Sequence, residues 1–133
     1  MIIGIGIDMI DSRRVEKLME KFGDQFSEKY FSDQENEIAN TKKTEKAKIL
    51  FYAKRFAAKE ACAKALGTGI RDDVLMRNIE ILNDGLGKPE ITLYGETKEF
   101  LNSLEPHGTE KTIHISISDE EPYAIAQVMI EAF

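Results

Sequence analysis

The sequence predicts an α+β fold, a compact single domain over residues 1–133 with a largely antiparallel sheet and one long helix. The chain has 133 residues, about the size of one ordinary domain, and no repeat, linker or low-complexity segment divides it. Helical and alternating hydrophobic patterns are grouped along the chain, whereas strict alternation of strands and helices would favour a parallel sheet.

The first two predicted elements are a strand and a helix. Residues 1–7 are rich in isoleucine and too short for a helix, so they predict a buried strand, with glycines where another backbone comes close. Apolar residues then recur at helical spacing over residues 15–22. Asp11 or Ser12 is placed to cap the start of this helix.

Two more helices are predicted before the middle of the chain. Ser32 and Glu35 have the spacing of a capping box, which indicates a short helix through about Asn40. From Ala47, alanines and larger apolar residues recur at helical spacing over about twenty residues. Gly67 follows as a natural left-handed stop, so a long helix is expected here.

The second half of the sequence predicts two hairpins with a helix between them. Turn-forming residues over 83–89 and over 119–122 separate the strands of each hairpin. Apolar residues over 100–104 indicate the intervening helix. The four strands are expected at residues 79–82, 91–94, 112–118 and 123–130.

The composition argues against several classes of protein. A formal net charge of −6 argues against a nucleic-acid binder that works through bulk charge. Cys62 is the only cysteine, which excludes an internal disulfide and a cysteine-based zinc cluster, so a reducing, cytoplasmic setting fits best. The apolar stretch over residues 1–7 is far too short to cross a membrane, and we expect no membrane partner.

Two carboxylates are candidate ligands for a metal ion. Asp8 follows the apolar strand where the pattern expects burial, although it could merely open the turn into the first helix. Glu60 lies among alanines that would let a ligand come close, although it could form an ordinary surface ion pair with Lys64 one turn later. Together they offer hard oxygen ligands of the kind that Mg²⁺ uses when phosphates and waters complete its coordination.

Other polar groups are candidates for binding phosphate or lining a cleft. The segment Gly67-Thr68-Gly69 could present backbone N–H groups to phosphate oxygens beside the ammonium of Lys64, although the order is not that of a P-loop. His114, Ser116 and Ser118 share one face of a predicted strand. They either face water or line a cleft.

Arg14, Lys17 and Lys21 form a stripe of positive charge on the first predicted helix, on the side away from its apolar residues. Such a stripe is usually a solvated face. In a chain that is otherwise acidic, it also suggests an acidic partner.

Four motifs, in this order and over nearly the whole chain, resemble the holo-[acyl-carrier-protein] synthase family, the short type of 4′-phosphopantetheinyl transferase. They are Gly6-Ile7-Asp8-Met9-Ile10 with Arg14, Phe56-Ala57-Ala58-Lys59-Glu60-Ala61 with Lys64 and Gly67-Thr68-Gly69, Gly87-Lys88-Pro89, and His114-Ile115-Ser116-Ile117-Ser118. Asp119 is a departure, since some relatives have histidine after the last serine.

The resemblance implies Mg²⁺-dependent transfer of the 4′-phosphopantetheine arm of coenzyme A to a serine of apo-acyl carrier protein. This reaction releases adenosine 3′,5′-bisphosphate and supports fatty acid biosynthesis. Asp8 and Glu60 fall on the family's Mg²⁺ ligands, and Lys64 beside them is a further candidate catalytic residue. The positions that fall in regions associated with coenzyme A are Lys64, Gly67, Thr68, Gly69, Gly87, Pro89, His114 and Ser116.

The resemblance also implies a homotrimer with its sites between subunits, and an acidic carrier protein that binds the stripe of Arg14, Lys17 and Lys21. A strand such as Ile113–Ile117 could pack its apolar face against a neighbouring subunit. The general base is left open between Glu60 and a water held by Glu60 or Asp8. The rival hypothesis is a non-enzymatic module that binds a nucleotide or an acyl thioester, with the carboxylates as structural ion pairs.

Overall fold

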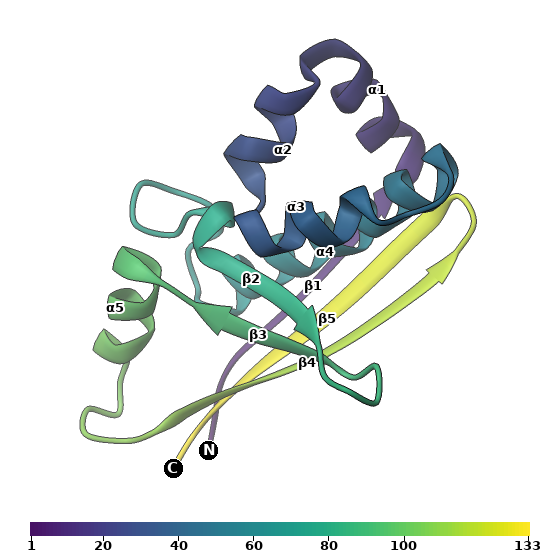
Figure 1. The fold of residues 1–133 in the computed structure, drawn as a ribbon. Helices are drawn as coiled ribbons and strands as arrows, with labels where there is room; N and C mark the ends of the chain where they lie inside the picture. The colour runs from purple at the N-terminus through teal and green to yellow at the C-terminus, as the bar shows by residue number, and fades with distance from the viewer.

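The computed structural model describes residues 1–133 and confirms the predicted α+β class (Figure 1). A 3-10 turn at Met76–Asn78 precedes the first hairpin. The elements are β1 (Ile2–Asp11), α1 (Ser12–Phe22), α2 (Asp24–Tyr30), α3 (Asp33–Asn40), α4 (Glu45–Ala65), β2 (Ile79–Asn83), β3 (Pro89–Leu93), α5 (Gly95–Ser103), β4 (Lys111–Glu120) and β5 (Tyr123–Ala132).

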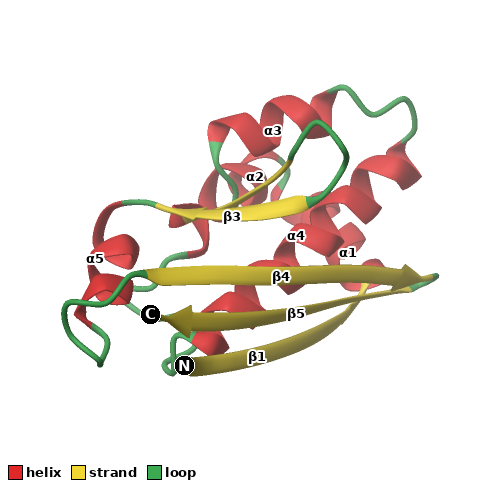
Figure 2. Cartoon of the chain, turned by 90° about the horizontal axis from the view of Figure 1, so that it is seen from below, coloured by secondary structure: helices red, strands yellow, loops and turns green.

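The strands form two antiparallel sheets. β5 lies between β1 and β4 in a three-stranded sheet, and β2 pairs with β3 in a separate hairpin. Figure 2 shows β3 running alongside β4, so the hairpin extends the layer of strands. The two ends of the chain lie side by side, and the N-terminal ammonium donates to the carbonyl oxygen of Ala132 at 2.7 Å (Figure 1).

Helix α4 packs directly on β1 because Gly4 and Gly6 have no side chains. A Cβ at Gly4 would lie 1.9 Å from the carbonyl oxygen of Ala65, and one at Gly6 would lie 1.9 Å from that of Ala61. The prediction of glycines where another backbone comes close is therefore confirmed. Since side chains alternate along a strand, the next residue on this face is Asp8, which is thereby held against α4.

The core is one cluster of 27 buried residues between the helices and the inner face of the three-stranded sheet. Most of α4 is buried, and its small residues let it lie close to the sheet. The rings of Phe26, Phe31 and Tyr52 contact one another between α2, α3 and α4. None of the helices combines the length and the apolar character that a membrane span requires.

Two local predictions needed correction. Helix α2 was missed, because its seven residues carry a single fully buried side chain, that of Phe26, and so leave no periodic pattern. Strand β1 continues to Asp11, so Asp8 lies within the strand and does not open the turn into α1. Asp11 caps α1 instead, and its carboxylate accepts a hydrogen bond from the backbone N–H of Arg13 at 2.9 Å.

The outer face of the three-stranded sheet is exposed, and it is apolar along β1. The isoleucines of β4 between Ile113 and Ile117 are partly buried against the core, and their contact with a neighbouring subunit stays a prediction. Alternation along the strands turns Ile5, Ile7 and Met9 of β1 outward, each more than half exposed. Any partner of this sheet would therefore bury β1 and the outer side chains of β5.

Candidate active site

Asp8, Glu60 and Lys64 come together where β1 crosses α4. The ammonium of Lys64 donates to Oδ1 of Asp8 at 3.1 Å and to the carbonyl oxygen of Ile7 at 3.0 Å. The ion pair expected between Glu60 and Lys64 on one helix face is not formed, because the lysine pairs across to β1. The structure thus brings together the three residues that the sequence predicted as catalytic.

The electrostatics of Glu60 show that the two carboxylates repel each other. Glu60 is half-buried and makes no hydrogen bond or ion pair. Its burial and the negative charge of Asp8 raise the pKa of Glu60, and the charges of Lys64 and Arg14 only partly offset this. A positive charge between Asp8 and Glu60 would relieve this repulsion.

The donor set fits a Mg²⁺ ion whose remaining ligands come from water and substrate. No group of three or more His, Cys, Asp or Glu side chains is placed to hold a metal, so the protein offers two carboxylates here. Proteins usually bind Mg²⁺ through one or two carboxylates plus substrate phosphates. The ammonium of Lys64 at Asp8 shows that a cation already stabilises this position.

The segment Gly67-Thr68-Gly69 completes the end of α4, and most of its N–H groups are already used. The N–H of Gly67 donates to the carbonyl oxygen of Lys64 at 2.9 Å, and that of Gly69 to Ala63 at 3.0 Å. The expectation that these two N–H groups face a phosphate was wrong, because the last carbonyls of a helix need donors. The N–H of Thr68 alone makes no backbone hydrogen bond.

The loop that contains Gly87 and Pro89 is closed by Asp84. The Asp84 carboxylate accepts hydrogen bonds from the backbone N–H groups of Leu86 at 2.8 Å and Lys88 at 2.9 Å, which lowers the pKa of Asp84. The N–H of Gly87 donates to the carbonyl oxygen of Asp84 at 3.0 Å. Leu86 at the tip of this loop is 97% exposed.

His114 and Ser116 lie far from the Asp8 cluster within one chain. Both point to the outer face of the sheet, where Nε2 of His114 is 3.1 Å from Oε1 of Glu131. Asp8 points to the opposite face, and β5 separates β1 from β4. A single chain therefore does not assemble all of the predicted coenzyme A residues.

Arg55 is a candidate binding residue that the sequence analysis missed. Its side chain is only 6% exposed and has no carboxylate partner, and its Nε makes no hydrogen bond. The guanidinium lies 4.1 Å from the centre of the Phe51 ring and 3.5 Å from Oδ1 of Asn83. Burial lowers the pKa of Arg55, and the charge of Glu35 only partly offsets this.

A cavity of about 370 Å³ adjoins Arg55, and Lys42 and Lys54 also line it. A buried cation without an ion-pair partner is costly, and a bound anion would offset that cost. Within the sequence, Arg55 is one of many charged residues on a helical pattern. Only its unpaired burial, which depends on the fold, distinguishes it.

The basic stripe of α1 borders a surface groove that also contains apolar side chains. Leu18 and the half-exposed Phe22 line the same groove as Arg14, Lys17 and Lys21. The prediction that the cations lie on the side away from the apolar residues was therefore wrong for Leu18 and Phe22. The groove combines positive charge with apolar surface, and Arg14 at one end is close enough to act on the pKa of Glu60.

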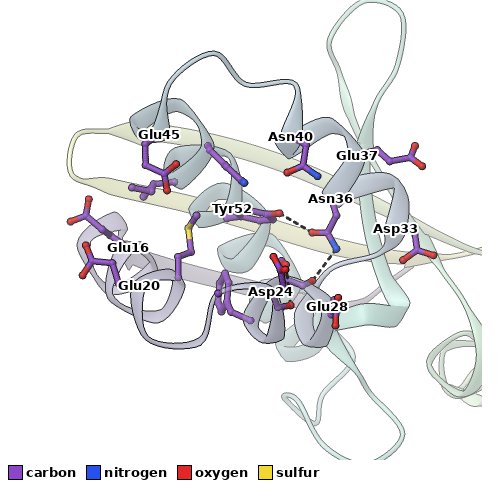
Figure 3. Close-up of a pocket in the computed structure, with 16 residues that line it drawn as sticks. Glu16, Glu20, Asp24, Glu28, Asp33, Asn36, Glu37, Asn40, Glu45 and Tyr52 are labelled. Carbon is purple, nitrogen blue, oxygen red and sulfur yellow. Dashed lines mark hydrogen bonds between the residues drawn. The ribbon is translucent and has the colours of Figure 1, made fainter.

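A larger cavity, of about 650 Å³, lies between helices α1 to α4 (Figure 3). Lys48 is the only cation in its lining, and Tyr52 donates to Oδ1 of Asn36 at 2.8 Å in its wall. Such a cavity repels an anionic ligand, so it does not fit a nucleotide. Its seven carboxylates are those of Glu16, Glu20, Asp24, Glu28, Asp33, Glu37 and Glu45.

Known proteins resemble this chain over almost its whole length. Residues 4–128 match the family model described as the 4′-phosphopantetheinyl transferase superfamily. The chain belongs to this superfamily. A holo-[acyl-carrier-protein] synthase from Caulobacter vibrioides is 47% identical over 132 residues, which cover 99% of this chain and 97% of that relative.

Solved structures agree with this assignment. The crystal structure of holo-[acyl-carrier-protein] synthase from Neisseria meningitidis matches with a TM-score of 0.86 and 40% identity, over 98% of this chain and 99% of that one. The enzyme from Bacillus anthracis, in complex with CoA (3′,5′-ADP), matches with a TM-score of 0.82 and 38% identity, over 100% and 99% of the two chains.

Within the superfamily, the chain is therefore a member of the holo-[acyl-carrier-protein] synthase family, as its four motifs indicated. The predicted activity is confirmed: a 4′-phosphopantetheinyl transferase that modifies apo-acyl carrier protein with the arm of coenzyme A. The rival hypothesis of a non-enzymatic binding module was wrong.

Proposed function

We propose that Asp8, Glu60 and Lys64 form the catalytic centre of this phosphopantetheinyl transfer, with Mg²⁺ as the cofactor held by the two carboxylates. The observation that carries the proposal is the pair of facing carboxylates, one of which already binds an ammonium. Two acidic side chains with hard oxygen donors and a neighbouring lysine match the needs of a reaction on a diphosphate.

In the reaction, the serine oxygen of the carrier protein forms a bond to the phosphorus that bears the pantetheine arm. The bond from that phosphorus to the bridging oxygen breaks, and adenosine 3′,5′-bisphosphate leaves with the electron pair. When bound, Mg²⁺ would neutralise negative charge on the diphosphate oxygens. Lys64, whose side chain is 49% exposed, can donate to the same oxygens from the end of α4.

The serine proton must move to a base as the new bond forms. Glu60 is the candidate, either directly or through a water, because its carboxylate makes no hydrogen bond or ion pair within the chain. Asp8 is the weaker candidate, since Lys64 already donates to its carboxylate.

The cavity beside Arg55 fits the phosphates of the nucleotide half of coenzyme A. Arg55, Lys42 and Lys54 offer three cations to one cavity, and Asn83 connects it to the hairpin that carries Gly87 and Pro89. Asp119 is a competing anion, because it pairs with Lys54 at 3.2 Å. A bound phosphate would give the unpaired Nε of Arg55 an acceptor.

A second copy of the chain would complete the site, in keeping with a homotrimer. Asp8 and His114 point to opposite faces of the sheet, so they can act on one substrate only if copies meet. The exposed apolar face around Ile5, Ile7 and Met9 supports such an assembly, since contiguous exposed apolar surface marks interaction sites. The groove on α1 would then accept the acidic carrier protein.

The test is mass spectrometry of apo-acyl carrier protein incubated with this protein, coenzyme A and Mg²⁺. The unaltered chain should add one phosphopantetheine group per carrier protein. Asp8→Asn and Glu60→Gln should each lose most of the transfer while circular dichroism shows an unchanged fold, because each removes a charge without changing core volume. Glu37→Gln, in the acidic cavity, is the matched control. Near-normal transfer by Asp8→Asn at low Mg²⁺ would refute the metal assignment.

A further inference from the structure

The carboxylate of Asp8 has a single hydrogen-bond partner, the ammonium of Lys64. The same ammonium also donates to the carbonyl oxygen of Ile7 at 3.0 Å, so it is held by two oxygens of β1. Glu60, one turn earlier on α4, has no partner of its own and is affected by the charges of both Asp8 and Lys64. Lys64 is thus the internal counter-charge of two acids.

We propose that Lys64 competes with the metal ion for Asp8: its ammonium occupies the carboxylate in the ligand-free protein and must leave when a divalent cation binds. The inference rests on the proposed function, because it assumes that Asp8 and Glu60 hold the metal. It adds that Lys64 weakens metal binding to the free protein.

The two partners differ in how easily they can move. Asp8 is fixed in the middle of β1 and its side chain is 20% exposed, whereas that of Lys64 is 49% exposed at the end of α4. A lysine has a flexible four-carbon stem and a compact charge, so it can turn to a new acceptor while Asp8 stays in place. The exchange therefore needs no movement of the backbone.

The phosphates of coenzyme A supply that new acceptor. A diphosphate beside the metal would draw the ammonium of Lys64 away from Asp8 and so free the carboxylate for the cation. Such coupling is reciprocal: if coenzyme A tightens metal binding, the metal tightens coenzyme A binding by the same factor. Lys64 therefore makes the metal site of the free protein weak and that of the substrate complex strong.

The experiment uses Mn²⁺ as the probe, with free Mn²⁺ measured by electron paramagnetic resonance in titrations of the full chain. Lys64→Met should bind Mn²⁺ about five-fold more tightly than the unaltered protein, equivalent to the ~1 kcal/mol between two unit charges 4 Å apart in water. Lys98→Met, on α5 and in no ion pair, makes the same change in net charge and should leave Mn²⁺ affinity unchanged. Lys64→Arg keeps the positive charge and should bind Mn²⁺ as weakly as the unaltered protein does.

A second readout is the effect of coenzyme A on the same titrations. The factor by which coenzyme A tightens Mn²⁺ binding should be smaller in Lys64→Met than in the unaltered protein, because the competition is already absent. Lys64→Gln serves in its place if circular dichroism shows that Lys64→Met is not folded.

The outcomes separate this inference from the proposed function. If Asp8→Asn abolishes Mn²⁺ binding but Lys64→Met binds it no more tightly than the unaltered chain, the metal site stands and the competition is refuted. If neither the unaltered chain nor Lys64→Met binds Mn²⁺, with or without coenzyme A, both proposals fail. If Lys64→Met binds Mn²⁺ more tightly, and the added substitution Asp8→Asn abolishes this binding, both proposals are supported.

Discussion

The ammonium of Lys59 lies 2.7 Å from Oε1 of Glu35, and solvent reaches neither side chain. Lys59 also donates to the carbonyl oxygens of Met76 and Ile79, and two backbone N–H groups donate to the Glu35 carboxylate. The pair joins α4 to α3 and β2, on a side of α4 other than the one that packs on β1. The next residue, Glu60, is thereby held at the candidate site.

Replacing Lys59 should be strongly destabilising. Lys59→Met leaves the charge of Glu35 buried without its ion-pair partner, and such a change costs about 3–5 kcal/mol of unfolding free energy. Urea unfolding followed by circular dichroism measures this. The double variant Lys59→Met with Glu35→Leu should lose less than the sum of the two single losses, because the residues are coupled. Additive losses would show that the pair contributes little beyond packing.

The exposed apolar face of the sheet should be an interface between copies. Ile7→Glu places a charge on that face, outside the core, so we expect smaller assemblies and lower activity with the fold retained. Light scattering at micromolar concentration measures the molar mass. Leu75→Glu, at a residue 41% exposed before the 3-10 turn, is the matched control and should leave the mass unchanged. An unaltered chain that is monomeric and fully active would contradict the prediction.

Glu60→Gln should make the metal-free protein more stable at neutral pH while removing most of its activity. Burial and Asp8 raise the pKa of Glu60 in the folded state, so the folded protein holds this proton more tightly than the unfolded chain. Glu60 therefore stabilises the folded state at pH values below its ordinary pKa. This contribution to the free energy of unfolding is lost as the pH rises through the raised pKa of the folded state.

The expected gain for Glu60→Gln at pH 7 is below about 1 kcal/mol, because the half-exposed carboxylate is screened by solvent. The gain should become small near pH 4, below the ordinary pKa of Glu60, where most of the group is protonated in both states. Thermal unfolding at both pH values, in chelator and then in Mg²⁺, measures it. A variant that is less stable than the unaltered chain at pH 7 would show that Glu60 is not under electrostatic strain.

Local patterns accounted for most of the fold. Alternation and helical spacing indicated the five strands and the long helix, and the capping box at Ser32 and Glu35 formed as expected. Helix α2 could not be predicted in this way, because one buried phenylalanine does not give a repeating hydrophobic pattern. The exposure of the outward face of β1 could not be predicted either, because Ile5 and Ile7 look like core residues in a sequence.

The candidate site was predicted as a set of residues but not as an arrangement. Glycine spacing indicated the close approach that places Asp8 on α4, yet the partner of Lys64 depends on which strand crosses the helix. Arg55 was missed because its importance depends on a buried Nε without a hydrogen-bond partner, which is a property of the folded chain. Contacts between residues distant in sequence decide both features.

Arg55→Met should weaken coenzyme A binding and leave the ligand-free protein at least as stable. The variant removes a buried cation without an ion-pair partner, and a hydrogen bond from a charged group contributes about 1.5–3 kcal/mol. The KM for coenzyme A should therefore rise by about ten-fold or more, with the KM for carrier protein unchanged. Lys29→Met, on the exposed side of α2, is the control. An unchanged KM for coenzyme A would exclude the cavity as its phosphate site.

The groove on α1 should bind the acidic carrier protein through Lys17 and Lys21. Arg14 is left unchanged in this test because its charge also acts on Glu60. Lys17→Glu with Lys21→Glu should raise the KM for carrier protein about ten-fold at low salt, with the KM for coenzyme A and kcat almost unchanged, since exposed charges act mainly on the rate of encounter. The difference from the unaltered protein should shrink as salt rises, because exposed charges more than about 10 Å apart are largely screened at ~0.1 M. Lys43→Glu with Lys98→Glu makes the same change in net charge away from the groove and should leave both KM values near normal. If both double variants raise the KM for carrier protein equally, net charge and not the groove attracts the partner.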